Sequence, residues 1–260
     1  MNKLTDTHAH YDDEAYNNDR YSLLDRLFST CVNKIVTVGC GYDRWKPTMQ
    51  MADCYYEVYA ALGIHPEEIY DLPEDYLQQL EELSKNPKVK AIGEMGLDYH
   101  YENYDKELQI KVFREQLQLA DRLSMPAIIH SRDATADTLA ILRELRPKKA
   151  VMHCFSGSAE TAREVLDMGL YISFTGVVTF NNAVKAVEAC KEVPLDRLML
   201  ETDCPYMAPV PYRGQRCDSS MISATAEKIA EIKGINADEL IEICNENADR
   251  FFQLDTNPDY

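Results

Sequence analysis

The chain has 260 residues, of which 45% are hydrophobic, and a formal net charge of −17 from 27 basic and 44 acidic side chains. So large a negative charge argues against a broad basic surface that binds nucleic acid by releasing counterions. A polyanionic substrate would therefore have to be received by a few arginines or by bound cations. No apolar run reaches the roughly 20 residues of a membrane span, and the length is typical of one α/β barrel. We expect a single domain over residues 1–260 and no membrane partner.

Eight cysteines are scattered along the sequence without a CxxC pair, and the first residues, MNKLTD, form no apolar signal segment. An even number of cysteines is compatible with disulfides, but reduced and mostly buried thiols are expected in a chain of this length without a secretory signal. We therefore expect a cytosolic or nuclear protein, with the cytoplasm as the prediction. No segment indicates an obligate protein partner.

Short segments rich in strand-forming residues alternate with helical patterns from one end of the sequence to the other. The expected strands are 4–10, 34–39, 58–63, 89–94, 127–130, 150–153, 171–175 and 198–202. Amphipathic helical patterns are clearest at 106–123, 161–168, 219–232 and 237–252. Regular alternation of this kind is compatible with an open doubly wound sheet or with a closed (β/α)8 barrel.

Candidate metal ligands stand at the ends of several expected strands. His8 and His10 end the first strand, and on an extended backbone residues two positions apart point to the same face. The ends of later strands carry Glu94, His130, His153 and Asp203. A barrel brings the carboxyl ends of all its strands to one rim, whereas an open sheet separates them by about 4.8 Å per strand. The distribution therefore favours a (β/α)8 TIM-like barrel with its active site at the C-terminal rim.

Four imidazoles and two carboxylates exceed the three protein ligands of a catalytic zinc with one open position. Two divalent cations roughly 3.5–4 Å apart, bridged by a carboxylate, use such a set better. Glu94 is the natural bridge, because its strand stands between the His8/His10 pair and the His130/His153 pair. Imidazole favours zinc, manganese or nickel over magnesium, but carboxylates and phosphate oxygens also support magnesium, so the identity of the metal stays open.

At this point the sequence resembles the TatD family of metal-dependent deoxyribonucleases, within the amidohydrolase-like metal hydrolases. The similarity runs over essentially the whole length, through TDTHAH, GIHP, AIGEMGLDY, IIHSRDA, HCFSG, SFTG and LETDCPY in the expected order. The resemblance implies a TIM-like barrel and a divalent-metal site formed by His8, His10, Glu94, His130, His153 and Asp203. One departure follows the last motif, where Cys217 and Ser219 occupy positions that many family members fill with Asn and Pro. It leaves the metal set intact and concerns the substrate contacts of this loop.

We expect hydrolysis of phosphodiester bonds of DNA, as an exonuclease on single-stranded ends, by water activated at two divalent cations. Glu94 would bridge the ions, and Asp203 would bind one of them and accept a proton from the nucleophilic water. The family also contains members assigned to removing mischarged D-amino acids from tRNA. Ester or amide hydrolysis is therefore the alternative, with RNA or aminoacyl-tRNA as the partner. A metal-stabilised binding protein without catalysis is the non-enzymatic alternative.

Local phosphate contacts are expected from Arg132, Arg213 and Arg216, with His65 of the GIHP motif as a further donor at the rim. Surface salt bridges are the alternative role of the arginines, and a hydrogen bond within its own loop is that of His65. Tyr206 is expected either to stack on a base or to be buried.

Other polar residues near the ligands are expected to have structural roles. Cys154 follows a ligand on its strand, so alternation directs it beneath the helices. Asp12, Asp13 and Glu14 are expected to be solvated loop carboxylates, with an approach of Asp12 or Asp13 to the rim as the alternative. Glu201 lies two positions before Asp203 and is a candidate for a buried partner of a metal ligand.

Overall fold

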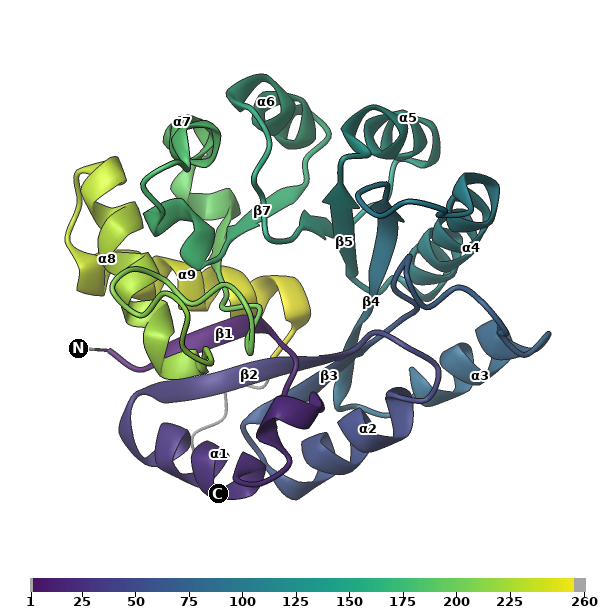
Figure 1. Cartoon of the computed structure of the whole chain (residues 1–260), viewed down its shortest axis with the longest axis horizontal. Coiled ribbons are helices and arrows are strands. Elements are labelled where there is room, and N and C mark those ends of the chain that lie inside the picture. Colours follow the sequence, from purple (N-terminus) through teal and green to yellow (C-terminus); the bar gives the residue numbers. More distant parts are fainter. Residues whose placement is uncertain (1, 255–260) are drawn as a thin grey trace.

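The structure, a computed structural model, describes residues 2–254 and contains one parallel sheet of eight strands surrounded by helices (Figure 1). The strands pair in the order of the sequence, and each is parallel to its neighbours. Their bounds are β1 Leu4–Ala9, β2 Val32–Gly39, β3 Val58–Leu62, β4 Val89–Asp98, β5 Ala127–Arg132, β6 Ala150–Met152, β7 Tyr171–Phe174 and β8 Leu198–Leu200.

The barrel closes just beyond the end of β8. Asp203 N donates to His8 O over 2.9 Å, and His10 N donates to Cys204 O over 2.8 Å. Ala9 and Cys204 thereby form a parallel bridge between β1 and the segment after β8. An open doubly wound sheet would keep its first and last strands apart. The predicted (β/α)8 TIM-like barrel is therefore confirmed, with a short seam between β8 and β1.

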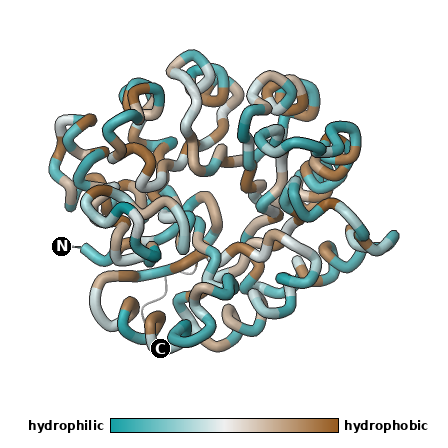
Figure 2. The backbone as a smooth tube through the Cα atoms, in the orientation of Figure 1, coloured by the Kyte–Doolittle hydropathy of each residue, from teal (hydrophilic) through white to brown (hydrophobic). Residues whose placement is uncertain are grey.

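Nine α-helices alternate with the strands within residues 2–254 and cover the outside of the barrel (Figure 1). Their bounds are α1 Arg20–Thr30, α2 Trp45–Cys54, α3 Tyr76–Leu83, α4 Lys106–Leu123, α5 Thr135–Leu145, α6 Ala159–Asp167, α7 Val184–Glu192, α8 Ile222–Lys233 and α9 Ala237–Phe252. The four helices expected from the sequence correspond to α4, α6, α8 and α9. Hydrophobic and hydrophilic residues recur in turn along these helices (Figure 2), as expected of helices with one apolar side. None of the helices in this part of the chain combines the length and hydropathy of a transmembrane segment.

Two layers of apolar side chains fill the protein. Alternate residues of the strands, such as Val36, Tyr59 and Ile128, form one buried cluster, while their neighbours pack against the helices. Phe251 and Phe252 of α9 belong to the first cluster. Because Lys90 at the start of β4 donates to the carbonyl of Gln253, α9 ends at the N-terminal end of the strands. The opposite end of the barrel is therefore left for the polar cluster.

Two buried glutamines of α4 hold the strand ends near that cluster. Gln109 donates to Asp98 O and accepts from Asp98 N, both over 2.9 Å. Gln116 donates to Ile64 O over 3.0 Å and accepts from Ile64 N over 2.7 Å. Each amide thus satisfies both backbone groups of one buried residue. Through these contacts α4 positions the end of β4 and the residue that precedes His65.

Candidate metal centre

The six residues expected to bind metal lie together at the C-terminal ends of the strands. Glu94 is at the centre of the cluster: its Oε2 is 3.2 Å from His8 Nε2 and 3.7 Å from His10 Nε2. Its Oε1 is 2.8 Å from His130 Nδ1 and 2.6 Å from His153 Nε2. One carboxylate therefore contacts all four imidazoles, two with each oxygen.

Asp203 completes one half of the cluster. Its Oδ1 is 3.2 Å from His10 Nε2 and 3.8 Å from His8 Nε2, and those two ring nitrogens are 3.1 Å apart. Asp203 adopts a left-handed backbone conformation, with φ of 60°, which turns its side chain back toward β1.

The donor set fits divalent cations. His8, His10 and Glu94 form one group of ligand atoms within 4.8 Å of one another, and Glu94, His130 and His153 form a second. Imidazole nitrogens and carboxylate oxygens are the ligands that zinc, manganese and related ions take in hydrolytic sites. The two groups share Glu94, which is the arrangement of a carboxylate bridge.

The close packing of these groups changes their proton affinities. Burial lowers the pKa of His8, and the charge of His153 adds to the effect. Burial also lowers the pKa of His10, but its bond to Asp203 more than compensates, and the pKa is raised well above the usual value. Burial raises the pKa of Glu94, yet the positive charges of His153 and His8 outweigh it and hold the pKa well below its usual range.

In two of the histidines, the ring nitrogen that faces away from Glu94 has an acceptor of its own. His10 Nδ1 lies 3.1 Å from Val38 O, and His130 Nε2 lies 3.0 Å from Asp98 Oδ2. Such partners orient ligand rings and select the tautomer. Asp98 was missed by the sequence reasoning. It lies four residues after Glu94, and this even spacing on one strand could have placed it on the same face.

Glycines allow β4 and β5 to approach closely behind the ligands. Gly96 has a φ of +151°, and a Cβ at this position would lie 2.0 Å from His130 O. Its pairing with His130 extends β4 and β5 beyond their expected ends at 94 and 130.

The cluster opens into a cavity of about 700 Å³, whose wall includes His65, Arg132 and Tyr206. His65 Nδ1 accepts from Glu67 N over 3.2 Å, and Nε2 lies 3.7 Å from Glu94 Oε1. Burial lowers the pKa of His65 to about 3, so the ring is neutral at pH 7. Since Nδ1 accepts a hydrogen bond, the proton is on Nε2 and faces the metal cluster.

The three predicted arginines are distributed unequally. Arg132 lines the cavity and lies over the ring of Tyr101, 5.3 Å from its centroid. Arg213 and Arg216 are absent from the cavity wall as far as residues 2–254 define it. The guanidinium of Arg213 lies 3.8 Å from the ring centroid of Phe180. Arg216 donates to both carboxylate oxygens of Asp19, over 2.7 and 2.6 Å.

The structure decides the positions of several further residues that line the cavity. Arg44, which the sequence reasoning missed, follows β2 and lies 4.0 Å from Asp12 Oδ2. The side chain of Asp12 is only 5% exposed, so it is a wall residue and not a solvated loop carboxylate. Tyr206 is 54% exposed and therefore accessible to a ligand. Cys154 lines the cavity, so the expectation that it packs beneath the helices is wrong. β6 ends at Met152, and strand alternation ends with it.

Ser219, one of the two departures from the family pattern, has a buried structural role. Its hydroxyl donates to Asp6 Oδ2 over 2.6 Å and lies 2.8 Å from the hydroxyl of Tyr11. Asp6 also accepts from Thr202 N over 3.0 Å and from Thr202 Oγ1 over 2.6 Å. This network crosses the seam between β1 and the segment after β8. It helps to hold His8 and Asp203 in register.

Comparison with known proteins agrees with this geometry. The family model described as TatD related DNase matches residues 5–253. The uncharacterized metal-dependent hydrolase YabD of Bacillus subtilis is 46% identical over 253 residues, covering 96% of this chain and 99% of YabD. The uncharacterized metal-dependent hydrolase YcfH of Escherichia coli is 38% identical over 262 residues, covering 98% and 97%.

Solved structures give the same result. The crystal structure of YjjV, a TatD homologue from Escherichia coli, superimposes with a TM-score of 0.91 at 29% identity, covering 97% of this chain and 98% of YjjV. A TatD family hydrolase from Entamoeba histolytica has a TM-score of 0.86 at 25% identity, covering 97% and 99%. With its barrel and its histidine–carboxylate cluster, this chain belongs to the TatD family and is a metal-dependent hydrolase.

Proposed function

We propose that the protein is a deoxyribonuclease that removes nucleotides from single-stranded DNA ends in the cytoplasm, using two divalent cations per chain. One observation carries this proposal: the shared carboxylate Glu94 and the ligand imidazoles His10, His130 and His153 line a cavity of about 700 Å³, whose wall also holds the donors His65 and Arg132. A phosphate has room to reach the cluster from the open side. His65 and Arg132 on the cavity wall are hydrogen-bond donors suited to its oxygens.

His8, His10 and Asp203 would hold one cation, His130 and His153 the other, and Glu94 would bridge them. Cations bound there would supply positive charge to the scissile phosphate and lower the pKa of water. Asp203 would accept the proton of the attacking water as its oxygen bonds to phosphorus and the bond to the leaving oxygen breaks.

Two donors would hold the phosphate during this step. The Nε2–H of His65 faces the cluster and would donate to a non-bridging oxygen of the phosphate. Arg132 would contact the neighbouring phosphate on the cavity wall. A neutral imidazole suits the first role, since it donates a hydrogen bond without adding a positive charge that would repel the cations.

The shape and charge of the rim favour action at an end. Asp12, Asp13, Glu67 and Glu68 line the cavity, against two arginines. A long polyanion would meet repulsion from these carboxylates, whereas a terminal nucleotide brings few phosphates. The exposed ring of Tyr206 offers a surface for one base.

The proposal is tested by supplying metal-loaded protein with 5′- and 3′-labelled single-stranded DNA, in parallel with a D-aminoacyl-tRNA. We expect stepwise shortening of the DNA. Turnover of the aminoacyl ester alone would refute a nuclease and favour the deacylase alternative. No turnover of either, with metal bound, would favour the non-enzymatic alternative.

Asp203→Asn tests the assigned proton acceptor. We expect kcat to fall about 100-fold or more, with the fold retained because Asn accepts a left-handed backbone. Asp133→Asn is the matched control, since Asp133 also has a positive φ, of 53°, but its side chain is 64% exposed and pairs with His100. Equal activity of the two variants would contradict the role of Asp203.

A further inference from the structure

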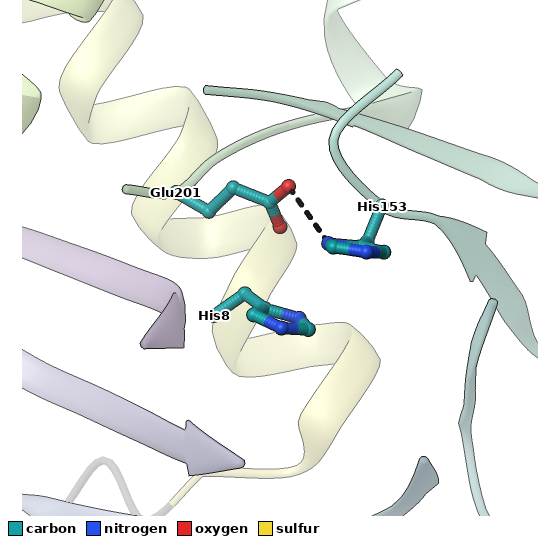
Figure 3. Close-up of side chains that lie close together, drawn as sticks. All are labelled: His8, His153 and Glu201. Carbon is teal, nitrogen blue, oxygen red and sulfur yellow. Dashed lines mark ion pairs between the residues drawn. The ribbon is translucent and has the colours of Figure 1, made fainter. Parts of the chain in front are cut away.

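A second carboxylate lies behind the metal cluster, on the side away from the cavity. Glu201 directly follows β8, and its side chain is 2% exposed. Its Oε1 accepts from Cys154 N over 2.5 Å and lies 3.5 Å from His153 Nδ1. Figure 3 shows Glu201 directed at the rings of His153 and His8.

The two imidazoles that Glu201 faces belong to different halves of the cluster. His8 and His153 are stacked, with ring centroids 4.1 Å apart and an interplanar angle of 13°. A ring nitrogen of each and a carboxylate oxygen of Glu201 lie within 4.8 Å of one another. His8 comes from the His10 and Asp203 half, whereas His153 comes from the His130 half.

Both rings have a buried Nδ1 that makes no hydrogen bond, although Glu201 Oε1 lies 3.5 Å from that of His153. Within residues 2–254, His8 Nδ1 and His153 Nδ1 are the two histidine nitrogens in this condition. In both rings Nε2 faces Glu94, at 3.2 Å for His8 and 2.6 Å for His153. A neutral imidazole that gives its Nε2 lone pair to a cation must carry its proton on Nδ1. Loading the cluster would therefore create two buried N–H donors, each of which needs an acceptor.

We propose that Glu201 is a shared positioning residue, whose carboxylate accepts from the Nδ1–H groups of both His8 and His153 and so supports both cation sites at once. This inference rests on the proposed two-cation centre. An ionised carboxylate has about four acceptor positions, and Cys154 N uses one of them. Glu94 and Glu201 then lie on opposite sides of the stacked pair, one at the Nε2 edges and the other at the Nδ1 edges.

Asp98 provides the natural contrast. Its carboxylate lies 3.0 Å from His130 Nε2 and also accepts from His100 N over 2.9 Å. Asp98 therefore contacts a ligand of only one cation site, that of His130 and His153. Removing the charge of Asp98 should weaken one cation site, whereas removing that of Glu201 should weaken both. Loss of such a partner typically lowers metal affinity 10- to 100-fold.

The experiment titrates metal-free protein with Zn²⁺ against a competing chelator and fits the two dissociation constants. We expect Glu201→Gln to raise both constants 10- to 100-fold, because an amide has one acceptor oxygen where three donors converge. Asp98→Asn should raise only one. Two unchanged constants, or a change confined to one, in Glu201→Gln would overturn the shared role.

Circular dichroism of the metal-free variants checks that they fold. If Glu201→Gln does not fold, Glu201→Asp replaces it as the test variant. It keeps the charge but draws the carboxylate back by one methylene, so we expect it to weaken both cation sites. Two unchanged dissociation constants in Glu201→Asp would overturn the proposal. The wild-type titration separates the two levels of inference. A wild-type chain that binds no Zn²⁺ refutes the metal centre itself, whereas wild-type binding of two ions with an unaffected Glu201 variant refutes only the role of Glu201.

Discussion

Replacement of Gly96 by alanine should damage both the fold and one cation site. The backbone of Gly96 has a φ of +151°, and an added Cβ would lie 2.0 Å from His130 O and 2.8 Å from His130 C. The backbone conformation costs about 1–3 kcal/mol for a residue with a side chain. Forcing β4 and β5 apart costs about another 1–3 kcal/mol. We expect the free energy of unfolding to fall by about 2–6 kcal/mol.

Gly169→Ala is the matched control. Gly169 has a φ of +80°, but among the residues that the structure describes no atom lies within 4 Å of an added Cβ. Only the cost of the left-handed conformation remains, about 1–2 kcal/mol. Gly169 lies beyond the end of α6 and is not among the residues of the cluster.

Urea denaturation of the metal-free proteins measures both stabilities, and Zn²⁺ titration measures the cation sites. In Gly96→Ala the displaced His130 should weaken one site, while Gly169→Ala should bind both ions as the wild type does. A Gly96→Ala protein as stable as Gly169→Ala, with two intact sites, would refute the close approach of β4 and β5 as the reason for this glycine.

Three further predictions concern the rim and the seam. As salt is raised and the rim carboxylates are screened, the KM for a long single-stranded DNA should fall relative to that for a dinucleotide; a rising ratio would contradict the repulsion. Arg132→Ala should raise the KM for DNA about tenfold, and Arg216→Ala less than twofold, because Asp19 already engages Arg216; equal effects in steady-state assays would contradict the difference. Burial raises the pKa of Asp6 from 3.8 to about 6, so the folded metal-free protein keeps this proton to higher pH than the unfolded chain does. The free energy of unfolding of the wild type relative to Asp6→Asn should therefore be greatest below about pH 4 and fall by about 3 kcal/mol as the pH rises to 6. Urea unfolding at several pH values measures this difference, and a difference that does not change with pH would contradict the raised pKa of Asp6.

The barrel was predictable because its signals are local. The strands are short segments rich in strand-forming residues, and helical patterns recur between them, so the order of elements can be read along the chain. The ends of the strands were less predictable. β4 extends four residues past Glu94 because it pairs with β5, and β6 stops before His153. Those differences explain why Asp98 was missed and why the expected position of Cys154 was wrong.

The sequence by itself determined the family, the barrel and the set of six candidate ligands, because the residues at the ends of parallel strands share one rim whatever the loops do. Only the tertiary structure decided the surroundings of that set. Whether an arginine meets the cavity or Asp19, 197 residues away, depends on how the loops pack. The same holds for Glu201, whose place between His8 and His153 exists only because three strand ends converge.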